Sequence, residues 1–210
     1  MQTWNEHYTR EKSKLNYPDE NLVRMLSKEI RENRFLQNGK ALDLGCGSGR
    51  HLKLLNDFEF GTVIGTDLSP QALKICDGTL MVCNNMNLPI KNESIDLIIA
   101  WGSLHYNYKS ETPQMIAEIL RVLKKSGVFL GTLRCSKDTF LKKGTNLGND
   151  VWQTSLTDIE GTISAFYDEN EIKALFSGFE VAEIGLSERT IVGDLGKLIS
   201  HWVIRGVKTV

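Results

Sequence analysis

Short apolar runs alternate with longer amphipathic stretches along most of the chain after residue 40. Each apolar run has the length of a strand buried in a sheet, whereas the amphipathic stretches repeat hydrophobic residues at helical spacing. The predicted strands cover residues 41–44, 62–66, 79–83, 95–100 and 128–133. Because strands alternate with helices, the pattern predicts βαβ units, a parallel sheet and right-handed crossovers.

Capping residues mark where several predicted helices begin or end. Asp19 and Glu20 precede a stretch with helical spacing, and Asn38-Gly39 ends it. Ser69 fits an N-cap with Pro70 at the first helical position. Further predicted helices follow the first strand to about residue 56 and cover residues 113–124 and 168–177. Together with the strands, these helices predict the α/β class.

Three segments depart from this alternation. Residues 1–39 are polar with interleaved aromatics and then helical, which predicts an N-terminal helical cap. Residues 135–165 are less regular and more polar, so we expect an insertion near the active site at the open end of the sheet. Residues 179–187 and 198–207 predict an antiparallel hairpin at the sheet edge. No repeat or linker divides the chain, so residues 1–210 are expected to form one domain.

Composition narrows the classes of protein that fit. Apolar residues make up 41% and charged residues 24%, as in ordinary globular proteins. A net charge of −1 gives no basic footprint, which argues against a dedicated nucleic-acid partner. The four cysteines form no CxxC pair, so no metal site is expected. Without a signal-like or membrane-spanning apolar run, the sequence predicts a cytoplasmic protein with no membrane partner.

A glycine-rich turn carries the strongest chemical signal. Gly45, Gly47 and Gly49 follow the first buried strand and precede a helix, so the backbone can approach a ligand closely. Asp67 ends the next strand, where an acidic side chain can accept hydrogen bonds from both ribose hydroxyls of a nucleoside. Each feature alone could be structural, as a chain reversal or a helix cap. Their combination favours a nucleoside site.

Two side chains bear on the choice of nucleoside. The dinucleotide fingerprint has a small residue at its sixth position, where this chain has Arg50. Asp43, two residues before the first glycine, suits a cationic group such as the amino group of a methionine moiety. S-adenosylmethionine is therefore the first choice of cofactor, and NAD is the alternative.

At these residues the chain resembles the class I S-adenosylmethionine-dependent methyltransferases, particularly the "type 11"-like group that acts on small molecules. The resemblance runs from about Lys40 to Leu133 and rests on five motifs in order. They are Asp43-Leu44-Gly45-Cys46-Gly47-Ser48-Gly49, Gly65-Thr66-Asp67-Leu68-Ser69, Asn87-Leu88-Pro89 with Ser94-Ile95-Asp96-Leu97-Ile98, Leu104-His105, and Arg121-Val122-Leu123-Lys124. The resemblance implies a Rossmann-like three-layer sandwich, with a seven-stranded, mostly parallel sheet whose last strand is antiparallel.

The resemblance also implies a cofactor, S-adenosyl-L-methionine, a product, S-adenosyl-L-homocysteine, and residues that bind them. The glycines would line the methionine end and the ribose, Leu68 would pack on the adenine, and Trp101 would lie beside the sulfonium. Asn84 stands where the family often has Asp, so a neutral amide would contact the adenine amine. The full set of expected cofactor residues is Tyr8, Asp43, Gly45, Gly47, Gly49, Asp67, Leu68, Asn84, Asn85, Met86 and Trp101.

The methyl acceptor is less constrained by the sequence. His105 follows the fourth strand, where it could act as a catalytic base or simply pack locally. Arg134 and Tyr106 are the expected acceptor contacts, Arg134 because it could hold an anion. Aromatic residues in the first segment and after the fourth strand could cover the site or pack as ordinary core; these are Trp4, Tyr8, Tyr17, Tyr106 and Tyr108.

Acceptor classes and alternative functions can be ranked from the same positions. Residues 100–103 lack the Asn/Asp-Pro-Pro-Tyr/Phe signature of adenine- and glutamine-directed methyltransferases. We therefore expect a small-molecule acceptor, such as a sugar or another natural-product intermediate. A catalytically inactive cofactor-binding subunit and an NAD-dependent oxidoreductase stay open as alternatives, and the sequence leaves the oligomeric state open.

Overall fold

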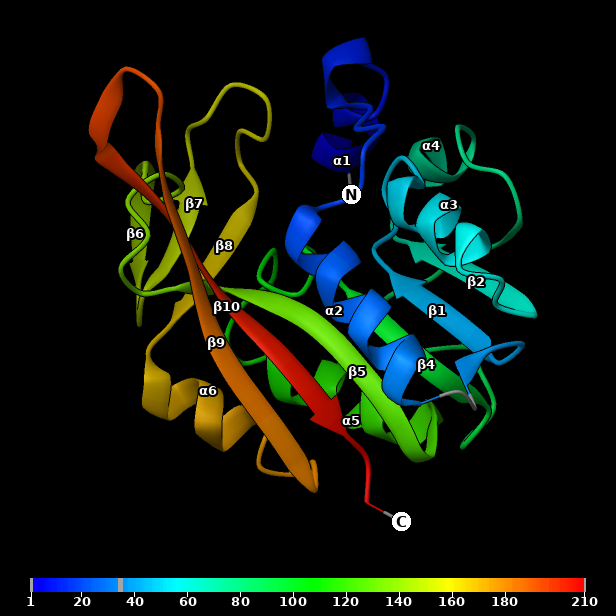
Figure 1. Cartoon of the computed structure of the whole chain (residues 1–210). Coiled ribbons are helices and arrows are strands. Elements are labelled where there is room, and N and C mark those ends of the chain that lie inside the picture. The colour runs from blue at the N-terminus through cyan, green and yellow to red at the C-terminus, as the bar shows by residue number, and fades with distance from the viewer. Residues whose placement is uncertain (1, 34–35, 210) are drawn as a thin grey trace.

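The five predicted apolar runs form neighbouring parallel strands of a twisted sheet (Figure 1). The computed structural model describes residues 2–33 and 36–209, so residues 1, 34–35 and 210 of the predicted cap and domain lie outside the described residues. These strands lie side by side in the order β3-β2-β1-β4-β5. Their bounds are β1 Lys40–Leu44, β2 Thr62–Asp67, β3 Thr79–Val82, β4 Ile95–Ala100 and β5 Leu123–Cys135.

A C-terminal hairpin completes the main sheet. β9 (Val181–Ile191) and β10 (Asp194–Val207) pair antiparallel, and β10 also pairs antiparallel with β5. The main sheet thus has the order β3-β2-β1-β4-β5-β10-β9, with the last strand of the chain reversed. The predicted class, a mostly parallel sheet with an antiparallel last strand, is confirmed.

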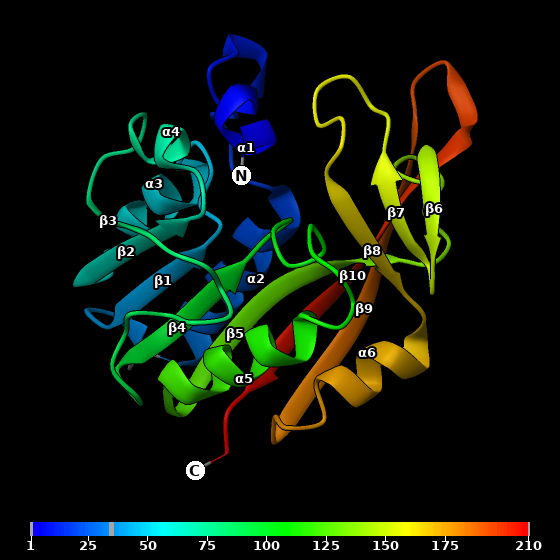
Figure 2. The same ribbon diagram turned by 180° about the vertical axis from the view of Figure 1, so that it is seen from behind.

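The predicted count of seven strands is too low, because the described residues contain ten. The three additional strands are β6 (Gly144–Gly148), β7 (Val151–Thr154) and β8 (Ile163–Tyr167). β6 was missed because it is exposed throughout and lacks an apolar repeat. β8 attaches to the end of β5 beyond β4, through the pairs Arg134–Phe166 and Cys135–Tyr167. This attachment brings the small sheet beside the open end of the main one (Figure 2).

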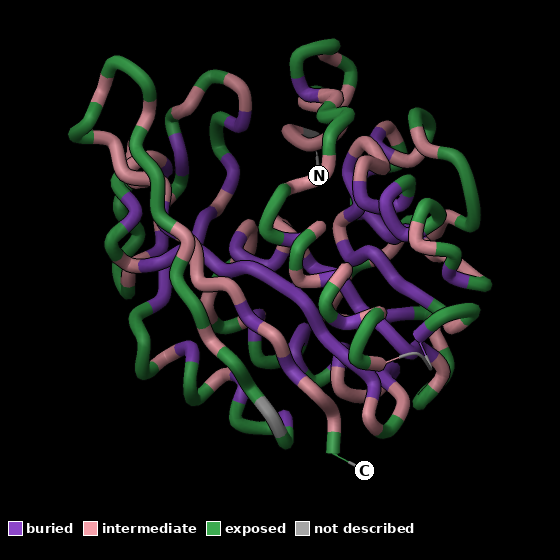
Figure 3. The backbone as a smooth tube through the Cα atoms, in the orientation of Figure 1, coloured by how far each residue is buried: buried purple, intermediate pink, exposed green. Residues whose placement is uncertain are grey.

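Helices cover both faces of the sheet, because consecutive strand residues point to opposite sides. Leu97 and Ile99 of β4 pack with residues of α2 (Glu20–Glu32) and α3 (Arg50–Asp57). Ile98 and Ala100 pack on the other face with residues of α5 (Thr112–Val122) and α6 (Glu169–Leu175). The result is the three-layer sandwich, with buried strands between two helical layers (Figure 3). The helices are α1 Gln2–His7, η1 Glu11–Ser13, α2 Glu20–Glu32, α3 Arg50–Asp57, α4 Pro70–Leu73, α5 Thr112–Val122 and α6 Glu169–Leu175.

Polar side chains set the helix starts as predicted. The Asp19 carboxylate accepts a hydrogen bond from Asn21 N, and the Ser69 hydroxyl accepts one from Ala72 N. Asp168 and Glu171 form a reciprocal capping box at α6. None of the helices among the described residues is long and apolar enough to cross a bilayer.

A buried ion pair holds α2 against the hairpin. Glu29 is 1% exposed, and its carboxylate accepts hydrogen bonds from Nε and Nη2 of Arg205 on β10. Asn33 Nδ2 donates a third hydrogen bond to the same carboxylate at 2.9 Å. Since α2 leads into β1, this pair fixes the first helix of the main fold to its last strand.

Replacing Glu29 with alanine should lower the free energy of unfolding by about 3 kcal/mol, because a buried ion pair loses one partner. The Arg205 guanidinium would keep only the Glu183 carboxylate, 3.8 Å away. Urea denaturation measures the change in the free energy of unfolding. Glu20→Ala is the matched control, because Glu20 and its partner Arg24 are both exposed to solvent. Equal losses in both variants would contradict the structural role of the Glu29–Arg205 pair.

Candidate active site

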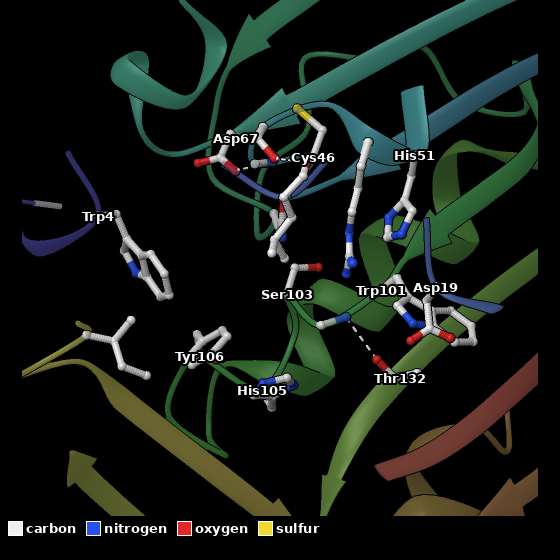
Figure 4. Close-up of a pocket in the computed structure, with 18 of the residues that line it drawn as sticks. Trp4, Asp19, Cys46, His51, Asp67, Trp101, Ser103, His105, Tyr106 and Thr132 are labelled. Carbon is white, nitrogen blue, oxygen red and sulfur yellow. Dashed lines mark hydrogen bonds between the residues drawn. The ribbon is translucent and has the colours of Figure 1, made fainter. Parts of the chain in front are cut away.

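A cavity of about 580 Å³ opens where the parallel strands end. It is lined by the glycine turn after β1, the ends of β2, β4 and β5, the N-terminal segment and the C-terminal hairpin. Its lining includes the turn after β1 and residues 101–103 after β4. The strand order reverses direction between these two strands, and open α/β sheets bind ligands at such a position. Figure 4 shows the side chains that converge on this cavity.

The glycine turn adopts a backbone that side chains would disturb. Gly45 and Gly47 have φ of +71° and +54°. A Cβ on Gly45 would lie 2.4 Å from Cβ of Ser103, and one on Gly47 would lie 2.6 Å from the Tyr8 hydroxyl oxygen. The N–H groups of Gly45 and Cys46 both donate to the Thr66 carbonyl, which fixes the turn to β2. Glycine is therefore required here by contacts on both sides of the turn.

Asp67 is fixed at the wall of the cavity by backbone donors. Gly47 N donates to one of its carboxylate oxygens at 3.0 Å, and Ser69 N donates to the other at 2.8 Å. Burial raises the pKa of Asp67, and these backbone hydrogen bonds oppose the rise. Each carboxylate oxygen can accept a further hydrogen bond, so the side chain can still bind a pair of hydroxyl groups.

Asp43 lies beneath the glycine turn and is 1% exposed, outside the cavity lining. Its Oδ2 has no hydrogen-bond partner. Burial and the nearby Asp67 raise the pKa of Asp43 to about 7, while Arg50 opposes the rise. An unpaired carboxylate with such a pKa would be stabilised by a cation bound at the turn above it.

Most of the predicted cofactor residues line the cavity, and three do not. The lining members are Tyr8, Gly45, Gly47, Asp67, Leu68, Asn84, Asn85 and Trp101. Besides Asp43, Gly49 lies outside the lining, at the start of α3, and Met86 packs against the main hydrophobic core. The binding roles of all eleven stay predictions.

The N-terminal segment crosses the mouth of the cavity. Asn5 Oδ1 accepts a hydrogen bond from the Ser69 hydroxyl on the glycine-turn side, and His7 Nδ1 lies 3.0 Å from the Asp158 carbonyl oxygen on the other. Trp4 packs edge-on against Tyr106, with ring centroids 4.8 Å apart. Trp4, Tyr8 and Tyr106 line the cavity, whereas Tyr17 and Tyr108 are exposed and do not.

His105 is 1% exposed, and neither of its ring nitrogens has a hydrogen-bond partner among the described residues. Burial, Arg134 and His201 hold its pKa well below the usual range for histidine, so the imidazole is neutral at pH 7. The ring lies 6.0 Å from that of His201 and 4.3 Å from that of Tyr106, measured between centroids. A neutral imidazole in a cavity wall can accept a proton or a hydrogen bond from a ligand.

Sequence reasoning missed the part of the cavity wall that the hairpin provides. His201, Val203, Ser187 and Arg189 all line the cavity. The sequence shows that Ser187 and Arg189, like His201 and Val203, are two residues apart and share a face of their strand. It does not show the register in which the two strands pair. Pairing His201 with both Arg134 and Ser187 places these side chains on the cavity face.

Comparison with known proteins gives the family. A family model described as a methyltransferase domain matches residues 42–131. An uncharacterized protein of Methanocaldococcus jannaschii is 30% identical over 170 residues, which cover 77% of this chain and 64% of that protein. A protein described as a SAM-dependent methyltransferase from Methanosarcina mazei has a similar structure, with a TM-score of 0.71 at 20% identity, covering 86% of this chain and 97% of that one. Residues 42–131 thus match the methyltransferase domain family, and the fold is that of the class I S-adenosylmethionine-dependent methyltransferases.

The family confirms the predicted fold class, enzyme class and cofactor of this methyltransferase. It leaves the acceptor undefined. The human protein named probable tRNA methyltransferase 9B is 34% identical over 107 residues, which are 46% of this chain and 22% of that protein. This methyltransferase thus spans 64% of the archaeal relative and less than a quarter of the human one, so their whole-protein activities are not transferred to it.

The affinity of the methyltransferase for S-adenosylhomocysteine should rise about tenfold from pH 6 to pH 8, because the ligand's ammonium group favours ionised Asp43. With a pKa of about 7, the Asp43 carboxyl group is mostly protonated and neutral at pH 6 and mostly ionised at pH 8. His51 and His201, with pKa values lowered to about 3, do not titrate in this range. Calorimetric titration measures the effect, and an equally steep pH profile in Asp43→Asn would contradict it.

Proposed function

We propose that this methyltransferase transfers a methyl group from S-adenosylmethionine to a small-molecule acceptor held between the cofactor and the C-terminal hairpin. The supporting observation is a single cavity lined both by the glycine turn and by a separate set of polar side chains. Its volume of about 580 Å³ falls in the range of small-ligand pockets. Cofactor and acceptor would therefore share one cavity, as direct methyl transfer requires.

The cofactor would occupy the part of the cavity around the glycine turn. Gly45 and Gly47 would face the methionine end and Asp67 would accept both ribose hydroxyls. Leu68, Asn84 and Asn85 would surround the adenine, and Trp101 and Tyr8 would lie near the sulfonium. Asp43 would act through its charge from below the turn. Met86 and Gly49 would support this arrangement from behind, since neither lines the cavity.

The acceptor would occupy the remaining space, in contact with Tyr106 and Arg134. Methyl transfer is an in-line displacement in which the acceptor atom bonds to the methyl carbon as the carbon–sulfur bond breaks. The cofactor supplies the reactive methyl group, and the protein positions the acceptor atom and receives its proton. His105 lines the cavity, and neither ring nitrogen has a hydrogen-bond partner among the described residues, so it can receive this proton. Its lowered pKa makes it a weak base until a negative charge lies beside it.

Two observations bear on the setting of this reaction. The four cysteines are free thiols in the described residues, which supports a reducing compartment such as the cytoplasm. Relatives named as tRNA methyltransferases match 46% of this chain, so transfer RNA enters the test as the competing acceptor. A net charge of −1 favours the small molecule.

The proposal is tested with S-adenosylmethionine labelled in its methyl group, incubated with the protein and either a low-molecular-weight metabolite extract or bulk transfer RNA. Label should enter the small-molecule fraction. Asp67→Ala should abolish transfer, and His105→Ala should lower kcat about a hundredfold, because a general base is lost. Asp77→Ala is the control for Asp67→Ala, because Asp77 is an exposed acid outside the cavity lining.

Other outcomes would replace the proposal. Label found only in transfer RNA would make the protein an RNA methyltransferase. Bound S-adenosylhomocysteine without any transfer would favour the inactive cofactor-binding subunit. Binding of NADH in place of S-adenosylhomocysteine would favour the oxidoreductase.

A further inference from the structure

Six side chains on one face of β5, β10 and β9 form a wall of the cavity, here called the strand wall. The register aligns Arg134 with His201 and His201 with Ser187, so these three lie in one row. Positions two residues away share their face. The strand wall consists of Thr132, Arg134, Val203, His201, Ser187 and Arg189, all of which line the cavity.

The carboxylates that line the cavity lie outside the strand wall, on the side of the glycine turn and Arg50. The strand wall carries two arginines and no carboxylate. The acidic residues that line the cavity are Asp19 and Asp67, which come from the start of α2 and the end of β2. Glu188, between two members of the strand wall, accepts a hydrogen bond from Ser200, its register partner on β10. Both belong to the opposite face, since alternate strand residues point to opposite sides.

Arg134 is fixed in place but not fully hydrogen-bonded. It is 7% exposed, and one of its terminal nitrogens donates to Asp138 Oδ2 at 2.6 Å. That carboxylate is itself held by the N–H groups of Leu141 and Ser200. Nε of Arg134 has no partner among the described residues. A buried N–H donor without an acceptor is costly, so this atom is suited to a ligand acceptor atom.

Arg134 and Arg189 also act on the histidines near them. Both histidines have lowered pKa values, His105 through burial, Arg134 and His201, and His201 through burial, Arg134 and Arg189. Asp138 pairs with Arg134, and the exposed Arg189 has no ion pair within 4.0 Å among the described residues. An anion beside the strand wall would meet a positive potential and two neutral imidazoles.

We infer that the acceptor is a small organic anion, whose charged group binds Arg134 Nε and Arg189 while its methylated atom lies towards His105. This inference rests on the proposed function and specifies its substrate class. The anion would supply a hydrogen-bond acceptor for the unpartnered Nε–H of Arg134 and a negatively charged partner for Arg189. A carboxylate and a phosphate would satisfy the same donors, so the test includes both.

The test uses benzoate, phenyl phosphate and neutral benzamide as probes of the protein saturated with S-adenosylhomocysteine. In calorimetric titrations, at least one of the two anions should bind about tenfold more tightly than benzamide. This ratio corresponds to about 1.4 kcal/mol in binding free energy. In nitrogen–proton spectra the Arg134 Nε–H signal should shift with the anion and not with benzamide. Whichever anion binds more tightly identifies the charged group as a carboxylate or a phosphate.

Three variants locate the binding site. Arg189→Gln should weaken anion binding about fivefold or more and leave S-adenosylhomocysteine binding unchanged. Arg134→Lys keeps the charge beside Asp138 but removes the Nε–H, so it should weaken anion binding without unfolding the protein. Arg24→Gln is the control, because Arg24 is exposed on α2, pairs with Glu20 and does not line the cavity.

The outcomes separate this inference from the proposed function. If benzamide binds as tightly as the anions, if no probe binds, or if Arg189→Gln has no effect on anion binding, the anionic acceptor is wrong. Each of these results leaves the methyltransferase proposal standing, provided that S-adenosylhomocysteine binds. If the wild-type protein does not bind S-adenosylhomocysteine, both the proposed function and the anionic acceptor lose their basis.

Discussion

The length of β5 is the constraint on which the arrangement of the molecule depends. β5 pairs with β4 on one side and with β10 on the other, and its last two residues continue past β4 to pair with β8. A strand that ended with β4 would lose the pairs Arg134–Phe166 and Cys135–Tyr167 with the small sheet and would remove Arg134 from the cavity. Because β5 is long, residues from the parallel strands and from the hairpin line the same cavity.

The two parts of that space differ in electrostatic character. Asp43 and Asp67 lie at the glycine turn, where burial raises the pKa of both and a positively charged sulfonium nucleoside would be stabilised. Arg134 and Arg189 lie on the opposite wall, where they favour a negatively charged ligand. Opposite charges on the two ligands would orient a cofactor and an acceptor towards each other in this cavity.

The sequence predicts the parts of this site that depend on local patterns. Gly45, Gly47 and Asp67 belong to a strand–turn–helix unit whose geometry follows from neighbouring residues, and the hairpin follows from two apolar strands close in sequence. The wall residues His201 and Arg189 depend on a register between strands that are distant from β5 in the chain. The polar strand β6 escaped detection because nothing on its exposed surface repeats. The unpaired oxygen of Asp43 and the unpartnered Nε of Arg134 result from packing around them, which no short pattern encodes.

The most direct test of the central claim is a crystal structure of the protein with S-adenosylhomocysteine. The account predicts the homocysteine over Gly45 and Gly47, the ribose hydroxyls on Asp67, and the sulfur pointing past Tyr106 and His105 towards Arg134. A nucleoside bound in the cavity with its sulfur directed away from the strand wall would contradict the shared site for cofactor and acceptor.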